Sequence, residues 1–258
     1  MTVSTPPCLA LATDYDETIA LEGVVDPKVV RALASLRKDG RPLVLVTGRE
    51  LDDLRRVFPD LAVFHRIVAE NGGLLYDPET GRERPLGPPP TVAFVEALKE
   101  RGVAPLEVGR VVVATREPYH HAVLEAIRAL GMELQIIFNK GGVMVLPPGI
   151  NKASGLKAAA GEIGVPLDAF VAVGDAENDH ALLAACGTSA AVANALPMLK
   201  ESADIVLSRP AGAGVVELIR RVWGIAGDDR AARLTRRSGR GPKARPAEPD
   251  PAVARTLP

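Results

Sequence analysis

Two carboxylates two residues apart, Asp14 and Asp16, offer this sequence its clearest chemistry. They follow an apolar run, residues 8–12, that is typical of a buried strand. In an open α/β sheet, ligands bind in the crevice at the carboxyl ends of the strands, so both side chains are expected there. Carboxylates held close together repel each other, which predicts a cation nearby, most simply a divalent metal. The pair could supply a nucleophile and a proton carrier, and the alternative is an ordinary surface turn.

Three later segments also place polar groups where a strand ends or a helix begins. These groups are Thr47, Gly48, Lys152, Asp175, Asn178 and Asp179. Backbone N–H groups around Gly48 could hold phosphate oxygens. An acidic metal site beside a hydroxyl, a lysine and free amides suits phosphoryl transfer, in which cations hold the phosphoryl oxygens while a nucleophile attacks in line.

The elements that must position these groups alternate between strands and helices. Strands are expected over 8–12, 42–46, 66–69, 170–173, 189–192 and 204–207, and helices over 27–39, 50–58, 152–163, 179–185, 197–201 and 214–223. Asp26 before Pro27 predicts the start of the first helix, and Asn151 is expected to open the third. Alternation with short connections predicts an α/β fold with a doubly wound parallel sheet.

Residues 75–148 depart from this pattern. Their first part, 77–90, is rich in Pro, Gly and charge and is interpreted as a turn and linker. Helices are then expected over 91–101 and 118–130, and strands over 109–115, 133–138 and 143–146. Residues 139–142 carry a strong hairpin signal, whose tip either hangs over the core as a specificity element or faces solvent. A small α+β unit inserted into the sheet domain is predicted.

Composition limits the remaining possibilities. A chain of 258 residues allows one large domain or two small ones, and its formal charge of −1 argues against a generally nucleic-acid-binding surface. The basic residues from 226 onward predict a disordered tail, with a basic arm for nucleic acid or an anionic membrane as the alternative. No secretory signal and no apolar run of about 20 residues is visible, so a cytoplasmic protein without membrane contact is expected.

Four motifs occur in order across residues 8–223: DYDET at 14–18, VTGR at 46–49, NKASGL at 151–156 and GDAENDH at 174–180. On these motifs the chain resembles the haloacid dehalogenase-like phosphohydrolases, specifically the Cof-type branch that is similar to sucrose-phosphatase. The resemblance implies a Rossmann-like catalytic core over 1–74 and 149–225. It also implies a substrate-selecting α+β cap over 75–148, short for this branch, and leaves 226–258 as the tail.

The resemblance also implies a function for each polar group of the motifs. Asp14 would be the nucleophile that forms an aspartyl-phosphate, and Asp16 would protonate the leaving oxygen and then activate water. Thr47 and Lys152 would bind the transferring phosphoryl group, together with the amides at Gly48.

A magnesium site is implied at the same place. Mg²⁺ would be held by Asp14, the backbone carbonyl of Asp16 and Asp175. Asp179 would either bind the ion as well or hold its ligands in place without contacting it. Asn178 matches a position that orients the acidic loop. Asn71 lies where relatives contact substrate or the cap hinge, although a simple turn is an equal interpretation.

Two positions of the motifs were open to more than one interpretation. Glu17 stands where the family usually has glycine, and it either points outward without a function or tunes leaving-group recognition. Arg49 is interpreted as a surface residue at a helix start, with a phosphate contact as the alternative.

The expected activity is that of a Mg²⁺-dependent phosphatase acting on a small phosphorylated metabolite, with a sugar phosphate as the expected substrate. A phosphomutase of the phosphomannomutase type, which returns the phosphoryl group to the substrate, is one alternative. A non-catalytic binding module on the same fold is another. The number of acidic groups argues against such a module, because burying like charges without use lowers stability.

Overall fold

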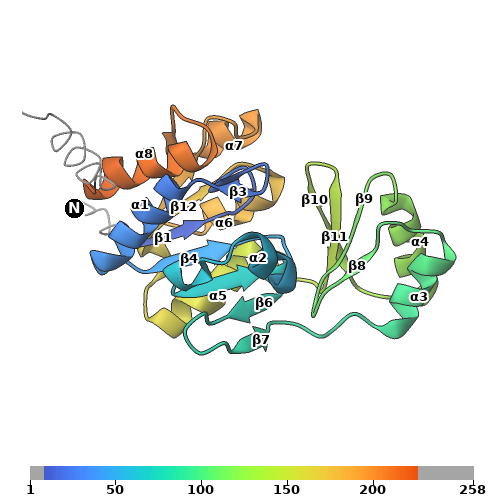
Figure 1. Ribbon diagram of the computed structural model, residues 1–258. Coiled ribbons are helices and arrows are strands. Elements are labelled where there is room, and N and C mark those ends of the chain that lie inside the picture. Colours follow the sequence, from blue (N-terminus) through green and yellow to red (C-terminus); the bar gives the residue numbers. More distant parts are fainter. Residues whose placement is uncertain (1–8, 226–258) are drawn as a thin grey trace, which may run out of the picture. The chain divides into compact units, whose positions relative to one another are not determined.

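The protein is described here by a computed structural model covering residues 9–225 (Figure 1). Its main sheet has the strand order β14-β13-β12-β1-β4-β5-β6-β7. The strands are β1 Ala10–Thr13, β4 Leu43–Val46, β5 Arg66–Ala69, β6 Leu74–Tyr76, β7 Glu83–Pro85, β12 Phe170–Gly174, β13 Thr188–Ala191 and β14 Ile205–Val206. The strands from β14 to β5 run parallel and are largely buried, as expected for a sheet covered by helices on both faces. The predicted α/β class is confirmed.

The middle of this sheet brings the motifs together. Strand β1 lies between β12 and β4, with Thr13 level with Val173 on one side and Leu45 on the other. The acidic motif, the VTGR motif and the GDAENDH motif therefore leave three neighbouring parallel strands at the same edge. This edge is where a ligand site is expected in such a fold.

Helix α5, Lys152–Ile163, begins at a well-defined cap. The Asn151 side chain accepts the N–H of Ser154 at 3.0 Å, and the Ser154 hydroxyl accepts the N–H of Asn151 at 2.9 Å. These reciprocal bonds satisfy two backbone donors that a helix start leaves without partners. The cap thereby fixes the first helical residue, Lys152, and α5 packs against β4 and β5.

The other core helices follow the expected pattern. They are α1 Pro27–Lys38, α2 Leu51–Val57, α6 His180–Ala184, α7 Pro197–Ser202 and α8 Ala211–Trp223. Asp26 accepts the N–H of Lys28 and starts α1 as predicted. The α6 region differs slightly, because Glu177–Asp179 forms a 3₁₀ turn before the α-helix begins.

Several antiparallel strand pairs were not predicted. The single strand expected over 109–115 is wrong, because residues 109–112 form a turn between two paired strands, 107–108 and 113–116. The segment 77–90, interpreted as a turn and linker, contains β7, which pairs antiparallel with β6. Pro78 and Gly81 belong to the tight turn at Asp77–Arg82, where Gly81 has a φ of +74°, and Pro85 ends β7. Strands β2 Ala20–Leu21 and β3 Val24–Val25 form a second hairpin, too short to leave a periodic signal.

A second sheet is built within residues 107–146, in the order β10-β11-β9-β8. Its strands are β8 Glu107–Val108, β9 Val113–Arg116, β10 Gln135–Asn139 and β11 Gly142–Leu146. Helices α3 Val92–Glu100 and α4 His120–Leu130 lie on one face of it (Figure 1). The predicted hairpin is confirmed: Lys140 and Gly141 form its two-residue turn, both with positive φ. We call 75–148 the cap, although this division of the chain stays a prediction.

A buried carboxylate ties the cap to the core. Glu70 accepts the N–H groups of Arg110, Val111 and Val112 at 2.9, 2.7 and 3.1 Å. A Cβ atom at Gly109 would lie 2.7 Å from this carboxylate, so glycine is needed for the close approach. The turn between β8 and β9 is thus held to the end of β5 by three charge-assisted hydrogen bonds.

The predicted tail, 226–258, and the first residue of the strand expected over 8–12 lie outside the described residues. Among the helices of 9–225, none has the length and apolar character required to cross a membrane.

Candidate active site

An ion cluster around Lys152 forms the centre of the site. The side chain is only 1% exposed, and Nζ donates to Oδ1 of Asp14 at 2.5 Å and to Oδ1 of Asp179 at 2.6 Å. Burial alone would lower the pKa of Lys152, but the two carboxylates outweigh it and raise that pKa above its ordinary value. Lys152 is therefore a permanent cation that joins the acidic motif to the GDAENDH motif.

Burial has the opposite effect on Asp14. It raises the pKa of this carboxyl to about 8, against the attraction of Lys152 and with further repulsion from Asp179 and Asp175. Burial thus opposes the ionised form of Asp14, and Lys152 favours it. A nucleophilic carboxylate at this position calls for an additional cation.

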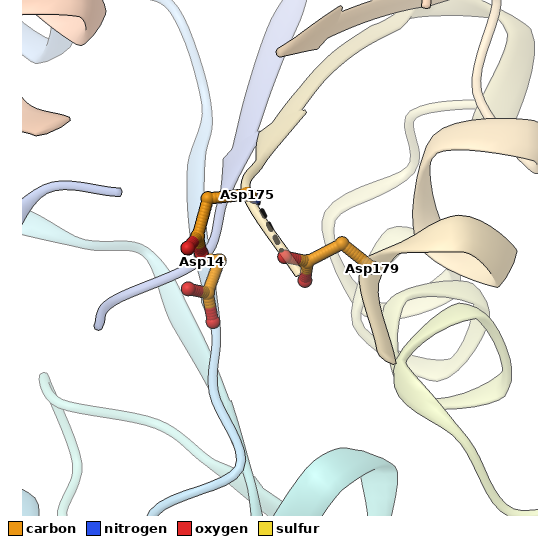
Figure 2. Close-up of side chains that lie close together, drawn as sticks. All are labelled: Asp14, Asp175 and Asp179. Atoms are coloured by element: carbon orange, nitrogen blue, oxygen red, sulfur yellow. Dashed lines mark hydrogen bonds between the residues drawn. The ribbon is translucent and has the colours of Figure 1, made fainter. Parts of the chain in front are cut away.

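Asp14, Asp175 and Asp179 form a buried acidic cluster (Figure 2). One carboxylate oxygen from each lies within 4.8 Å of the others. The second oxygen of Asp179 accepts the N–H groups of Asp175 and Ala176 at 2.9 and 3.1 Å. A Cβ atom at Gly174 would lie 2.5 Å from the Asp179 carboxyl, so glycine allows this packing. Since both oxygens of Asp179 already accept hydrogen bonds, its main effect is to hold the loop and Lys152.

Asp175 is held from two sides. Its Oδ1 accepts the hydroxyl of Thr18 at 3.0 Å, and its Oδ2 pairs with Nζ of Lys140 from the cap. Burial raises the pKa of Asp175, and the Lys140 hydrogen bond opposes that rise. The cap hairpin therefore reaches the acidic cluster directly.

Asp16 is not part of this cluster, because it faces Arg49. The guanidinium donates from Nε to Oδ2 of Asp16 at 2.9 Å and from Nη2 to Oδ1 at 2.6 Å, and Nη1 pairs with Asp53 at 2.5 Å. Burial would lower the pKa of Arg49, but Asp16 and Asp53 raise it. The interpretation of Arg49 as a surface residue is wrong: a bidentate pair fixes the Asp16 carboxylate geometrically.

Thr47 and Gly48 lie at the end of β4 as predicted. Thr47 is fully buried, and its Oγ1 accepts the N–H of Arg49 at 3.1 Å, so its hydroxyl hydrogen can donate elsewhere. A Cβ atom at Gly48 would lie 3.3 Å from Sδ of Met144 and 3.7 Å from the Asn178 amide. Gly48 is thus enclosed between cap and core.

Asn178 and Asn71 form a buried amide pair beside Gly48. Nδ2 of Asn178 donates to Oδ1 of Asn71 at 3.0 Å, and the backbone N–H of Asn71 donates to the Thr47 carbonyl. The remaining amide atoms, Nδ2 of Asn71 and Oδ1 of Asn178, are buried without a partner among the described residues. If both side-chain amides were rotated by 180°, one amide nitrogen and one amide oxygen would still lack a hydrogen-bond partner. The pair therefore offers one donor and one acceptor to a ligand.

A cavity of about 650 Å³ opens between these groups and the cap. Its core wall includes Asp14, Asp16, Gly48, Arg49 and Asp53, and its cap wall includes Thr115, Asn139, Gly142, Val143 and Met144. The volume suits a small metabolite. The nucleophile and proton carrier expected from the sequence both line it.

Glu17 adopts a conformation that favours glycine. Its φ is +56°, its Oε1 accepts the N–H of Glu22 at 3.0 Å, and its carbonyl accepts Nδ2 of Asn194 at 2.8 Å. These bonds hold the residue in the left-handed region, where a side chain costs about 1–2 kcal/mol.

We therefore expect Glu17→Gly to leave the free energy of unfolding unchanged or raise it by up to about 1 kcal/mol, because relief of strain offsets the lost side-chain hydrogen bond. Glu17→Val should lower it, since a β-branched residue fits this region poorly. Urea unfolding measures both. A glycine variant less stable than the valine variant would contradict this reading of the turn.

Sequence reasoning gave no catalytic or binding function to Thr18 and Glu70, and it gave one to Arg49 and Lys140 only as an alternative. Thr18 and Arg49 are the last residues of their motifs, which was the available signal. Glu70 carried no such signal in the sequence, because only the fold reveals that this charged side chain is fully buried. The hairpin tip that carries Lys140 had two possible interpretations, a specificity element over the core or a turn that faces solvent.

Comparison with known proteins agrees with this architecture. The family model for haloacid dehalogenase-like hydrolases matches residues 11–120 and 106–219. A phosphoglycolate phosphatase of Methanothermobacter thermautotrophicus is 30% identical, over 83% of this chain and 99% of that protein. Phosphoglycolate phosphatase 2 of Saccharolobus solfataricus is 31% identical, over 83% and 92%.

Solved structures share the fold at low identity. A haloacid dehalogenase-like hydrolase from Bacteroides thetaiotaomicron has a TM-score of 0.71 at 18% identity, over 83% of this chain and 99% of that one. One from B. subtilis has a TM-score of 0.65 at 18% identity, over the same shares. The expected family and the expected class of enzyme, a phosphatase, are confirmed. The chain belongs to the haloacid dehalogenase-like hydrolases.

Proposed function

We propose that the protein is a Mg²⁺-dependent phosphatase that hydrolyses a small phosphorylated metabolite through an aspartyl-phosphate on Asp14. The observation that carries this proposal is the placement of Asp14. It is buried, bonded to Lys152 and grouped with two further carboxylates at the mouth of a cavity. Such a placement has no evident structural benefit, since burial opposes ionisation of Asp14.

The donor set fits magnesium. Mg²⁺ prefers oxygen ligands and is commonly bound through one or two carboxylates. Asp14 and Asp175 are the suitable carboxylates, with the backbone carbonyl of Asp16 as a third proposed ligand, while Asp179 supports them. When bound, the ion would favour the ionised form of Asp14 and offset the negative charge of the phosphoryl group.

The chain's own residues then account for the reaction. A carboxylate oxygen of Asp14 attacks phosphorus, and the bond from phosphorus to the ester oxygen breaks as Asp16 donates a proton to that oxygen. Asp16 next removes a proton from water, whose oxygen attacks phosphorus and releases phosphate from Asp14. The Thr47 hydroxyl, the amides at Gly48 and the Lys152 ammonium hold the phosphoryl oxygens.

Phosphoglycolate is the substrate that we propose first, and a sugar phosphate comes second. The two relatives named above are phosphoglycolate phosphatases and match this chain over nearly their whole length. A cavity of this size accommodates either compound. Phosphoglycolate is therefore placed before a sugar phosphate because of the relatives and not because of the cavity.

A phosphate-release assay tests the proposal. Release from phosphoglycolate, hexose phosphates and p-nitrophenyl phosphate would be followed with Mg²⁺ and with excess chelator, with no bisphosphate added. We expect release that needs Mg²⁺ and is reduced by at least about 100-fold on chelation, because the ion contributes several kcal/mol to transition-state stabilisation. Equal release in chelator would contradict a metal-dependent site. Release that requires an activating bisphosphate would point to a phosphomutase instead.

A further inference from the structure

We propose that Lys140, at the tip of the cap hairpin, binds a carboxylate on the leaving group of the substrate and so selects phosphorylated hydroxy acids. This inference rests on the proposed phosphatase function and specifies its substrate class. It assigns the residue a binding function that the sequence motifs do not contain, because Lys140 lies outside all four of them.

The hairpin places Lys140 directly beside the reacting groups. Strands β10 and β11 pair up to Asn139 and Gly142, and the turn between them carries Lys140 at a φ of +46°. Nζ of Lys140 pairs with Oδ2 of Asp175, and its backbone N–H lies 3.3 Å from the Glu177 carboxylate. The tip is therefore seated on the loop that carries the acidic cluster.

The other cations of the site are already engaged. Lys152 donates to Asp14 and Asp179, and Arg49 holds Asp16 and Asp53. Arg56, which lines the cavity on the core side, also pairs with Asp53. Lys140 has one recorded carboxylate partner at the site, Asp175, to which Mg²⁺ would also bind. A divalent cation there would compete with the ammonium for the same carboxylate and leave Lys140 able to pair with an anion.

The cavity offers few other partners for a second anion on the cap side. Its cap wall is largely apolar, with Val112, Ala114, Val143 and Met144, and Glu107 there would repel an anion. The Thr115 hydroxyl, which also lines this wall, already donates to a backbone carbonyl. Next to Lys140, Oδ1 of Asn139 is buried without a partner among the described residues and could accept from a substrate hydroxyl. The hairpin end thus offers an acceptor on Asn139, which lines the cavity, and a cation on Lys140, the next residue in the chain.

Distance favours a short hydroxy acid. In phosphoglycolate a single methylene separates the ester oxygen from the carboxylate, so that carboxylate must bind within a few ångströms of the phosphoryl group. Lys140 meets this requirement, since its partner Asp175 has an oxygen within 4.8 Å of one on Asp14.

The test compares two substrates that differ only in this charge. Ethyl phosphate has a methyl group where phosphoglycolate has its carboxylate. We expect Lys140→Met to lower the ratio of kcat/KM for phosphoglycolate over that for ethyl phosphate by about 10- to 100-fold, the range for losing a hydrogen bond to a charged group. Lys140→Arg should restore most of the ratio. Lys99→Met, on exposed cap helix α3, removes a charge away from the cavity and should leave the ratio unchanged.

A binding measurement separates recognition from catalysis. In an Asp14→Asn background, calorimetry should show that Lys140→Met weakens phosphoglycolate binding by a similar factor. If both substrates lose activity equally and binding is unchanged, Lys140 acts through Asp175 or the cap position and the inference is wrong. If the unaltered protein releases phosphate from hexose phosphates but from neither of these two substrates, the inference is wrong. If it releases phosphate from none of the compounds, the proposed function has failed instead.

Discussion

Replacing Lys152 with Met is expected to lower the free energy of unfolding by about 3–5 kcal/mol, the range for removing one partner of a buried ion pair. The ammonium is 1% exposed and donates to two buried carboxylates, so its loss leaves Asp14 and Asp179 facing each other without a nearby cation. Chemical denaturation in chelator measures this effect. Activity should fall as well, because the same ammonium is proposed to hold the phosphoryl group.

A second variant shows whether repulsion is the cause. Asp14→Asn in the Lys152→Met background removes one of the two opposed charges, so the double variant should be at least about 1 kcal/mol more stable than the sum of the single effects. Lys157→Met, at an exposed position of the same helix, is the matched control and should change stability little. A Lys152→Met variant as stable as this control would contradict the expected cost of leaving two buried carboxylates without their cation.

Asp14→Asn is expected to reduce kcat/KM by about 10⁴-fold or more, in line with the loss of a catalytic nucleophile in other enzymes. The amide has nearly the same size as the carboxylate and can still accept from Lys152. The fold should therefore persist, since burial raises the pKa of Asp14 and so disfavours the charge that the substitution removes. Phosphate release and thermal unfolding, measured on the same sample, separate loss of chemistry from loss of structure.

The matched control is Asp39→Asn, at the exposed end of α1. It should retain full activity. An Asp14→Asn variant that stays folded and as active as this control would remove Asp14 from the mechanism.

Sequence was sufficient for the parts of the fold that follow local rules. The parallel strands are continuous apolar runs, and α1 and α5 begin at Asp26 and Asn151, which act as helix caps. Asp14, Thr47, Lys152 and Asp175 lie at strand ends or helix starts, where motif spacing placed them. Topology alone then brings three of these segments to one edge of the sheet.

The remaining features depend on contacts between distant segments. Arg49 was expected at the surface, yet its partner Asp16 lies more than 30 residues away in the chain. Glu70 is charged and was given no function, although the cap's backbone surrounds it. Lys140 could be placed on a hairpin tip, but whether that tip met solvent or Asp175 depended on how the cap packs. Such pairings leave no periodic pattern in the sequence.

The most direct test of the account is to trap the covalent intermediate. The protein would be mixed with phosphoglycolate labelled in its phosphate, quenched in acid within milliseconds, digested and mapped by mass spectrometry. We expect an acid-stable, base-labile phosphate on the peptide that contains Asp14, absent from Asp14→Asn and removed when excess unlabelled substrate is added. Rapid turnover with no labelled peptide at any quench time, or a label on another residue, would contradict nucleophilic catalysis by Asp14.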